Sequence, residues 1–172
     1  MLVLGIDPGT AITGYGLVRV DREVLEPVAY GVIRTPASDA LARRLQHLHH
    51  EMSQLIDAYG PTEGAVEELF FARNARTALS VGHARGVILL TLQQAALPIF
   101  EYTPLQVKQA ITGYGRASKG QVQQMVRVLL GLAAIPEPDD AADALAIAIC
   151  HVNSNSLPGR LAASAASSGD TP

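Results

Sequence analysis

Four acidic residues stand out in the sequence because each lies in or beside an apolar run. They are Asp7, Glu67, Asp140 and Asp143. A carboxylate removed from water is costly unless a positive group compensates its charge. Hard oxygen ligands gathered from distant parts of a chain are typical of a Mg²⁺ or Mn²⁺ site. The sequence therefore predicts a metal site assembled from these four acids, which are also the candidate catalytic residues.

The chemistry expected of such a site is phosphoryl transfer. Two divalent ions roughly 4 Å apart can hold both the attacking and the leaving oxygen of an in-line displacement, and bridging carboxylates keep the ions that close. The predicted reaction is hydrolysis of a phosphodiester by a metal-activated water. We expect two Mg²⁺ ions in each active site, with Mn²⁺ able to substitute.

Each acid except Asp143 also has a simpler interpretation. Asp7 suits a turn, Glu67 suits the exposed face of a strand, and Asp140 suits the start of a helix. Asp143 lies a full turn inside that helix, where it opens an apolar segment. The spacing of three places Asp140 and Asp143 on one helical face, which favours Asp140 over Asp139 as the partner of Asp143. For any one of these acids taken alone, the simpler interpretation is favoured. Four acids that can converge on one place favour the metal site.

Basic residues are concentrated between Ala72 and Gly131. Seven occur there against a single acid, Glu101, although the whole chain has a net charge of −3. They are Arg73, Arg76, Arg85, Lys108, Arg116, Lys119 and Arg127. A basic surface beside an acidic, metal-neutralised pocket suits a polyanionic substrate, whereas scattered solvated charge is the alternative.

Some residues of this basic span are candidates for contacting nucleic acid. Lys108 and Lys119 are the only lysines in the chain, and each lies in the first turns of a predicted helix. They can bind the scissile phosphate or its neighbours, with plain surface lysine as the alternative. Phe70 precedes Arg73 and Arg76, and an aromatic residue in a basic loop can stack on an unpaired base. We expect either Phe70 or its neighbouring phenylalanine to close the core instead.

Several other kinds of protein are excluded or disfavoured. The sequence holds no Walker A loop and no Gly-x-Gly-x-x-Gly motif. The histidines at 47, 49 and 50 do not share one helical face, so we expect them to be solvated helix residues. Cys150 is the single cysteine, which rules out an internal disulfide, and its apolar surroundings predict an inert thiol. No apolar run reaches membrane-spanning length and no signal peptide is recognisable, so we expect a soluble cytoplasmic protein.

The elements that must position these residues follow from hydrophobic periodicity and from turn and capping signals. Strands are expected at 2–6, 12–20, 28–33, 65–69 and 97–101, and helices at 41–59, 74–96, 103–113, 118–130 and 139–150. Ser38 or Asp39 is expected to cap the first helix and Asp139 the last. Capping boxes begin at Thr103 and Ser118. Short links between the first three strands predict an antiparallel meander.

These elements predict an α/β fold, a five-stranded mixed sheet with helices on both faces. Asp7 and Glu67 then lie on neighbouring strands, and the helix that begins near Asp140 docks over the same edge. The chain is expected to form one domain over residues 1–152. Residues 153–172 have little to bury and are expected to form a mobile tail.

With these residues in hand, the chain resembles the RuvC family of bacterial Holliday-junction resolvases over nearly its whole length, to about residue 152. The matching segments are 5–10, 13–16, 66–70, 85–86, 107–109, 118–123 and 140–148. The resemblance implies an RNase H-like fold and a homodimer. It also implies Mg²⁺- or Mn²⁺-dependent endodeoxyribonuclease activity that cuts two opposed strands of a four-way DNA junction in recombination and repair.

The resemblance also assigns roles to individual residues. The family's metal ligands fall on Asp7, Glu67, Asp140 and Asp143, its phosphate-contacting lysines on Lys108 and Lys119, and its junction-side aromatic on Phe70. The family acts with a branch-migration motor, RuvA with RuvB, so that complex is an implied partner.

A symmetric junction suits a two-fold dimer, because such a dimer presents two identical pockets at a fixed distance. The helix that holds Gly82 and Gly86 is our candidate for the dimer interface, although ordinary packing within one chain explains the same small residues equally well. Three other functions stay open. They are an RNase H-like nuclease for RNA or RNA–DNA hybrids, an actin-like or sugar-kinase-like nucleotide binder, and a junction-binding protein without catalysis.

Overall fold

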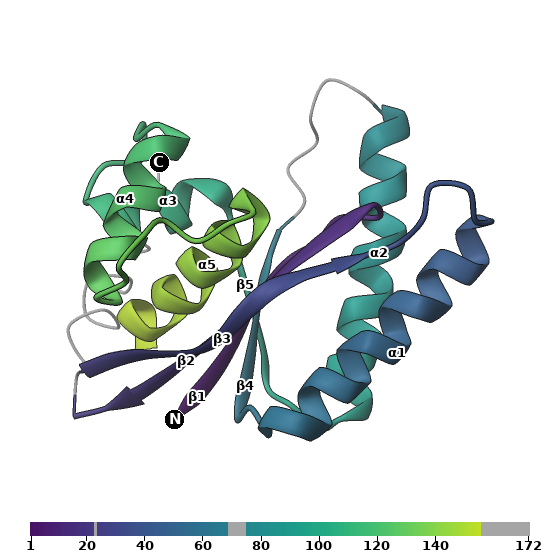
Figure 1. The fold of residues 1–172 in the computed structure, drawn as a ribbon, viewed down its shortest axis with the longest axis horizontal. Coiled ribbons are helices and arrows are strands. Elements are labelled where there is room, and N and C mark those ends of the chain that lie inside the picture. The colour runs from purple at the N-terminus through teal and green to yellow at the C-terminus, as the bar shows by residue number, and fades with distance from the viewer. Residues whose placement is uncertain (23, 69–74, 156–172) are drawn as a thin grey trace, which may run out of the picture.

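The computed structural model describes residues 1–22, 24–68 and 75–155, and of residues 75–77 it describes the backbone. The strands are β1 (Leu2–Asp7), β2 (Ile12–Asp21), β3 (Val24–Arg34), β4 (Glu63–Glu67) and β5 (Ile99–Tyr102). The helices are α1 (Leu41–Tyr59), α2 (Ala75–Gln94), α3 (Pro104–Thr112), α4 (Lys119–Leu129) and α5 (Asp139–Asn155). Figure 1 shows their arrangement.

The strands form one mixed sheet in the order β3-β2-β1-β4-β5. β1, β2 and β3 make an antiparallel meander, while β4 pairs in parallel with β1 on one side and with β5 on the other. The predicted fold class, five-stranded mixed sheet and meander are therefore confirmed. β1 is the central strand, and its residues 2–6 are buried because both faces of the sheet are covered.

Helices cover both faces of the sheet, as predicted (Figure 1). α1 and α2 lie on one face, where residues such as Leu4, Met52 and Ile88 form a buried cluster with it. α3, α4 and α5 lie on the other face, where Val126 and Leu145 belong to a second buried cluster. The molecule is thus a three-layer α/β sandwich.

α5 packs unusually close to the sheet because glycines of β1 and β2 face it. A Cβ atom added to Gly5 would lie 2.2 Å from the carbonyl oxygen of Ala144, and one added to Gly14 would lie 2.0 Å from the carbonyl oxygen of Asp140. One added to Gly16 would meet the side chain of Leu145 at 2.8 Å. The absence of side chains at these glycines therefore lets the helix backbone settle directly on the strands.

Local capping signals were predicted with mixed success. The capping boxes of α3 and α4 are formed as expected, by Thr103 with Gln106 and by Ser118 with Gln121. The capping role predicted for Ser38 or Asp39 is wrong, because Ala40 occupies the N-cap of α1 and makes no side-chain cap. Helix α5 begins at Asp139 itself, so this residue lies inside the first turn.

Helix α5 also continues to Asn155, beyond the domain boundary expected at 152. His151, one residue past the helix end expected at 150, is buried and lies against Glu63 of β4 and Tyr102 of β5. Within the described ranges, no helix combines the length and the apolar character needed to cross a membrane.

Candidate active site

The four predicted acids come together at the carboxyl ends of two adjacent parallel strands. Asp7 is the last residue of β1 and Glu67 is the last residue of β4. The register pairs Ile6 with Val66, so both strands end at the same edge of the sheet. Asp143 lies near the start of α5, which docks over this edge. Sequence positions up to 136 residues apart thus share one site.

The position of Asp140 is fixed by the same close packing of α5. Gly14 is paired with Asp7 across the β1–β2 ladder, and the backbone of Asp140 lies directly against Gly14. Asp140 is close enough to raise the pKa of both Asp7 and Asp143 through charge repulsion. The first turn of α5 therefore brings its acids over the end of β1, as the spacing of three predicted.

Burial and mutual repulsion both disfavour ionisation of the acids. Burial first, and then the charges of Glu67, Asp143 and Asp140, raise the pKa of Asp7 to about 8, although Lys119 opposes this shift. Burial and then Asp143 raise the pKa of Glu67 to about 7. Burial also raises the pKa of Asp143, although its hydrogen bond to Lys119 opposes that effect. Such a group of carboxyls needs positive charge to be fully ionised at neutral pH.

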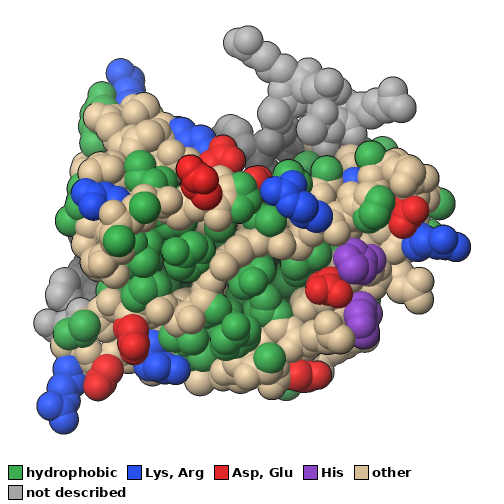
Figure 2. Space-filling model, in the orientation of Figure 1, with side chains coloured by type: hydrophobic (Ala, Val, Ile, Leu, Met, Phe, Trp, Pro, Cys, Tyr) green, Lys and Arg blue, Asp and Glu red, His purple; other side chains and the backbone are tan. Residues whose placement is uncertain are grey.

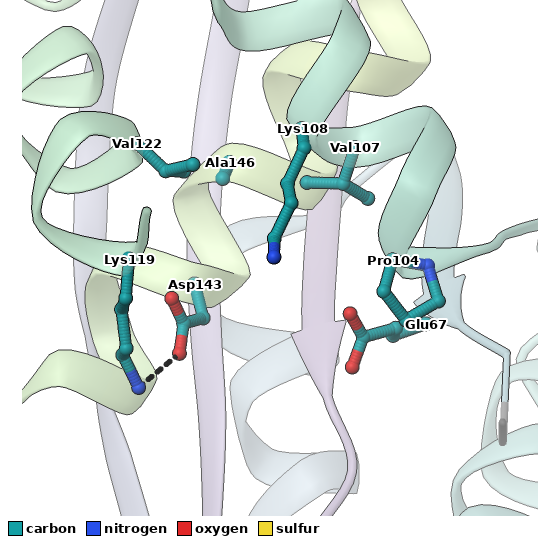
Figure 3. Close-up of a pocket in the computed structure, with 8 residues that line it drawn as sticks. All are labelled: Glu67, Pro104, Val107, Lys108, Lys119, Val122, Asp143 and Ala146. Atoms are coloured by element: carbon teal, nitrogen blue, oxygen red, sulfur yellow. Dashed lines mark ion pairs between the residues drawn. The ribbon is translucent and has the colours of Figure 1, made fainter. Parts of the chain in front are cut away.

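Lys119 supplies part of that positive charge. Its Nζ lies 2.7 Å from Oδ2 of Asp139 and 2.8 Å from Oδ2 of Asp143, and Figure 3 marks the second of these ion pairs. Burial works to lower the pKa of Lys119, but its hydrogen bonds to the two acids outweigh burial and raise the pKa above the usual range. The same contact lowers the pKa of the exposed Asp139. Asp139 is thus a partner of the lysine.

A pocket lies beside these groups, with a cavity of about 190 Å³. This is several times the roughly 30 Å³ share of a water molecule in the liquid. Its lining consists of Glu67, Pro104, Val107, Lys108, Lys119, Val122, Asp143 and Ala146. The Lys108 amino group points into the space between Asp143 and Glu67 (Figure 3). Both lysines line this pocket and lower the pKa of Glu67, so both border the acidic site, whereas their contact with phosphate stays a prediction.

The donor set fits a hard divalent cation, since it consists of carboxylate oxygens whose repulsion a cation would relieve. The side chains are not preassembled for coordination. In the part of the chain that the structure describes, no three His, Cys, Asp or Glu side chains are gathered so that they could hold a metal ion as they stand. Cation binding would therefore need local movement of the acidic side chains, of which Asp143 has one oxygen, Oδ2, paired with Lys119.

Some predicted contacts lie outside the described residues. These are Phe70 and Arg73, together with the side chain of Arg76. Their proposed contacts with nucleic acid stay predictions.

The structure corrects the interpretation of one basic residue. Arg85 was counted with the basic surface, but it forms an ion pair with Glu101, the single acid of the same span. Its Nε also donates to the backbone carbonyl oxygen of Glu67 at 3.4 Å. No local pattern predicts this pair, because α2 and β5 meet only in the folded chain.

The histidine cluster of α1 is partly as expected. His47 and His50 are exposed, and Figure 2 shows histidine side chains gathered over α1. The prediction for His49 is wrong, because this residue is half-buried with Nδ1 2.8 Å from Oγ1 of Thr91 on α2. Cys150 is buried, and burial raises the pKa of its thiol to about 11, which agrees with an inert cysteine.

The sheet order, with acids at the ends of β1 and β4 and on the helix docked over them, defines an RNase H-like α/β protein with an acidic active-site centre. The chain belongs to the family described as "Crossover junction endodeoxyribonuclease RuvC", whose model matches residues 3–151.

Individual relatives and structures agree with this assignment. The chain is 60% identical to the RuvC of Desulfitobacterium hafniense over 161 residues, which covers 94% of this chain and 98% of the relative. It is also 60% identical to the RuvC of Heliobacterium modesticaldum over 154 residues, covering 90% and 95% of the two chains. The structure matches "T. thermophilus RuvC in complex with Holliday junction substrate" with a TM-score of 0.87 and 37% identity, covering 92% and 97% of the two chains.

Proposed function

We propose that this protein is a structure-selective endonuclease that resolves four-way (Holliday) DNA junctions by paired phosphodiester hydrolysis in recombination and repair. The observation that carries the proposal is the convergence of four acids and two lysines in and beside one pocket. They are Asp7, Glu67, Asp140, Asp143, Lys108 and Lys119. Family membership supports the same substrate, because the Thermus thermophilus relative is described in complex with a Holliday junction.

In this proposal the four carboxylates are the ligands of two Mg²⁺ ions, for which Mn²⁺ substitutes. The bound ions would supply activation of the attacking water and stabilisation of the leaving oxygen. Lys108, whose amino group already points between Asp143 and Glu67, binds the scissile phosphate or its neighbour. Lys119 is paired with Asp139 and Asp143, and its charge would become available to the DNA backbone if a bound cation replaced it at Asp143.

Further DNA contacts are assigned to the segment that follows β4. Phe70 stacks on an unpaired base near the junction centre, and Arg73 and Arg76 bind flanking phosphates. We place the nuclease domain over residues 1–155, three residues beyond the expected boundary at 152, because α5 is helical to Asn155. The remainder of the tail expected at 153–172 lies outside the described residues.

We also propose a homodimer whose interface includes α2. Leu79 and Leu90 of α2 are 64% and 55% exposed, and a Cβ added to Gly86 between them would meet nothing within 4 Å. The spacings of seven and four place these three residues on one helical face. A second copy of the chain would bury this apolar face, and a two-fold dimer matches the symmetry of a four-way junction.

The dimer is tested by replacing Gly82 or Gly86 with leucine. Either variant should shift the monomer–dimer equilibrium towards monomer in sedimentation velocity, because the added side chain holds the two helices apart. Leu105→Gln, which changes an exposed leucine of α3, serves as the control. Unchanged dimers in both glycine variants would exclude α2 from the interface.

The proposed function places the protein in the cytoplasm with the chromosome, acting with the RuvA–RuvB branch-migration complex. The relatives named above are bacterial, which supports this setting. Co-migration of the protein with RuvA–RuvB on a four-way junction, but not with RuvA–RuvB alone, would be the expected result.

The decisive experiment uses Asp7→Asn with a four-way DNA junction, duplex DNA and an RNA–DNA hybrid as substrates. The wild type should cut the junction symmetrically with Mg²⁺ or Mn²⁺. The variant should bind the junction as tightly or more tightly without cutting it, because a ligand and a charge that repels phosphate are both removed. Asp57→Asn, on the exposed face of α1, is the matched control. Full cleavage by Asp7→Asn, or preferential cleavage of the hybrid by the wild type, would overturn the proposal.

A further inference from the structure

Arg85 makes two contacts behind the acidic site, from the opposite face of the sheet. It extends from α2 and pairs with Glu101 of β5, and its Nε donates to the carbonyl oxygen of Glu67. Its side chain is 20% exposed. A guanidinium that is largely buried and already paired has little charge left for a phosphate in solution.

The contact reaches the backbone of a candidate metal ligand at the point where its strand ends. Glu67 is the last residue of β4, and the next amide, that of Glu68, donates to the carbonyl oxygen of Tyr102 at 2.8 Å. β5 therefore holds this strand end from one side, and Arg85 holds it from α2. The register pairs Val66 with Glu101 and Glu67 with Tyr102. Glu101 thus faces α2, while the Glu67 carboxylate faces α5 and the pocket.

Helix α2 holds the neighbouring strand end as well. Oγ1 of Thr10, three residues after Asp7, donates to the carbonyl oxygen of Ser80 at 2.5 Å and lies 2.7 Å from Oγ of Ser80. The carbonyl oxygen of Thr10 in turn accepts hydrogen bonds from Thr35 and, at 3.0 Å, from Arg44 of α1. Thr10 and Thr35 are both buried, so these bonds are shielded from water.

We propose that Arg85 is a positioning residue for the nuclease site. It fixes the backbone of Glu67 so that the carboxylate of this residue points at Asp7 and Asp143. The Thr10–Ser80 hydrogen bond likewise attaches the turn after Asp7 to α2. Since α2 touches the ends of both strands that carry acids, a displacement of α2 displaces the metal ligands. This inference rests on the proposed metal-dependent function.

The test separates positioning from DNA contact by three measurements on Arg85→Gln. The first is the midpoint of a Mn²⁺ titration, read as the rise in melting temperature without DNA. The second is junction binding in EDTA across a range of salt concentrations. The third is the kcat and KM of junction cleavage. Loss of a group that orients a metal ligand typically lowers metal affinity or activity about 10- to 100-fold.

We expect the Mn²⁺ midpoint to rise about tenfold and kcat to fall at least about tenfold. KM, the affinity for the junction in EDTA and the salt slope should stay unchanged, because Arg85 is neutralised by Glu101. Glu101→Gln is the second variant, and it should give a smaller shift of the Mn²⁺ midpoint because Arg85 keeps its bond to the Glu67 carbonyl. Arg19→Gln removes an exposed ion pair, with Glu26 at 3.3 Å, and serves as the control for loss of a pair alone.

Weaker junction binding with a lower salt slope and a normal Mn²⁺ midpoint would overturn the proposal, since Arg85 would then contact DNA. Normal values throughout would also overturn it. If Arg85→Gln does not fold, a Glu101→Gln variant with an unchanged Mn²⁺ midpoint and unchanged kcat refutes the positioning role. Failure of the proposed function is distinguishable, because the wild type itself would then show neither stabilisation by Mn²⁺ nor cleavage.

Discussion

Replacing Asp7 with asparagine should stabilise the metal-free protein while it abolishes cleavage. Burial and three neighbouring acids raise the pKa of the Asp7 carboxyl from 3.8 to about 8. The folded protein therefore resists ionisation of this group, whereas the unfolded chain does not. Asparagine keeps the approximate size and polarity of the side chain but carries no titratable proton, so it removes this conflict.

The sign and size of the effect follow from linkage. A carboxyl whose pKa is raised by folding favours the folded state at low pH, relative to high pH, and this contribution is lost as pH rises from about 4 to about 8. The loss is about 1.4 kcal/mol for each pH unit in that window. Relative to the fully protonated state, the free energy of unfolding falls by about 1.5 kcal/mol at pH 5 and about 4 kcal/mol at pH 7. These are upper bounds, because water entry and movement of the acids relieve part of the burial penalty and of the repulsion.

The assay is urea denaturation in EDTA at pH 5 and at pH 7, on the wild type, Asp7→Asn and the control Asp57→Asn. The stability of Asp7→Asn relative to the wild type should increase by up to about 2.5 kcal/mol between the two pH values. Saturating Mn²⁺ should then stabilise the wild type more than the variant, because a cation bound only to the folded state adds RT ln(1 + [L]/Kd). A difference between the two proteins that does not change with pH would refute the reasoning.

Two further predictions concern packing and DNA binding. Gly14→Ala should destabilise the protein by about 1–3 kcal/mol and reduce cleavage, because the new Cβ would lie 2.0 Å from the carbonyl oxygen of Asp140. Gly120→Ala, whose added Cβ would meet nothing within 4 Å, should instead increase the free energy of unfolding by up to about 1 kcal/mol in urea denaturation of both variants, and equal effects of the two substitutions would contradict this account. Junction binding should weaken steeply with salt, and Lys108→Gln should reduce the slope of log K against log salt by about one, with Arg19→Gln as control. An unchanged slope for Lys108→Gln would exclude this lysine from the DNA-binding surface.

The features that the sequence predicted correctly are those with a local signature. The apolar run of β1 ends on Asp7, so the same short segment of sequence predicts both the strand and the acid at its end. The capping boxes at Thr103 and Ser118 each need only four consecutive residues, and both are formed. The spacing of Asp140 and Asp143 places them on one face of any helix. Local stereochemistry alone was sufficient for each of these predictions.

The features that the sequence did not predict depend on contacts between distant segments. His151 is fully buried, with Nδ1 2.7 Å from the Tyr102 hydroxyl and Nε2 against the carboxylate of Glu63. These partners come from β5 and β4, so no pattern within α5 indicates that the helix continues past residue 150 and places a histidine on its buried face. The Arg85–Glu101 pair escaped prediction for the same reason, since charge alone does not distinguish a residue that faces DNA from one that faces another helix or strand.

The convergence of the acids has a cause that only the strand register shows. Gly5 pairs with Gly16 and Asp7 pairs with Gly14. The face of the sheet that carries Asp7 therefore has adjacent glycines, which leave a surface without side chains next to this acid. α5 packs on this glycine surface, and its Leu145, Ile147 and Ile149 are almost completely buried. Burial of side chains of this size contributes about 1.5–3 kcal/mol each, or on the order of 5–9 kcal/mol for the three. That exceeds the cost of up to about 4 kcal/mol for ionising Asp7 near pH 7, to which burial and the neighbouring acids both contribute. Packing of α5 can therefore hold the acids together before any cation binds.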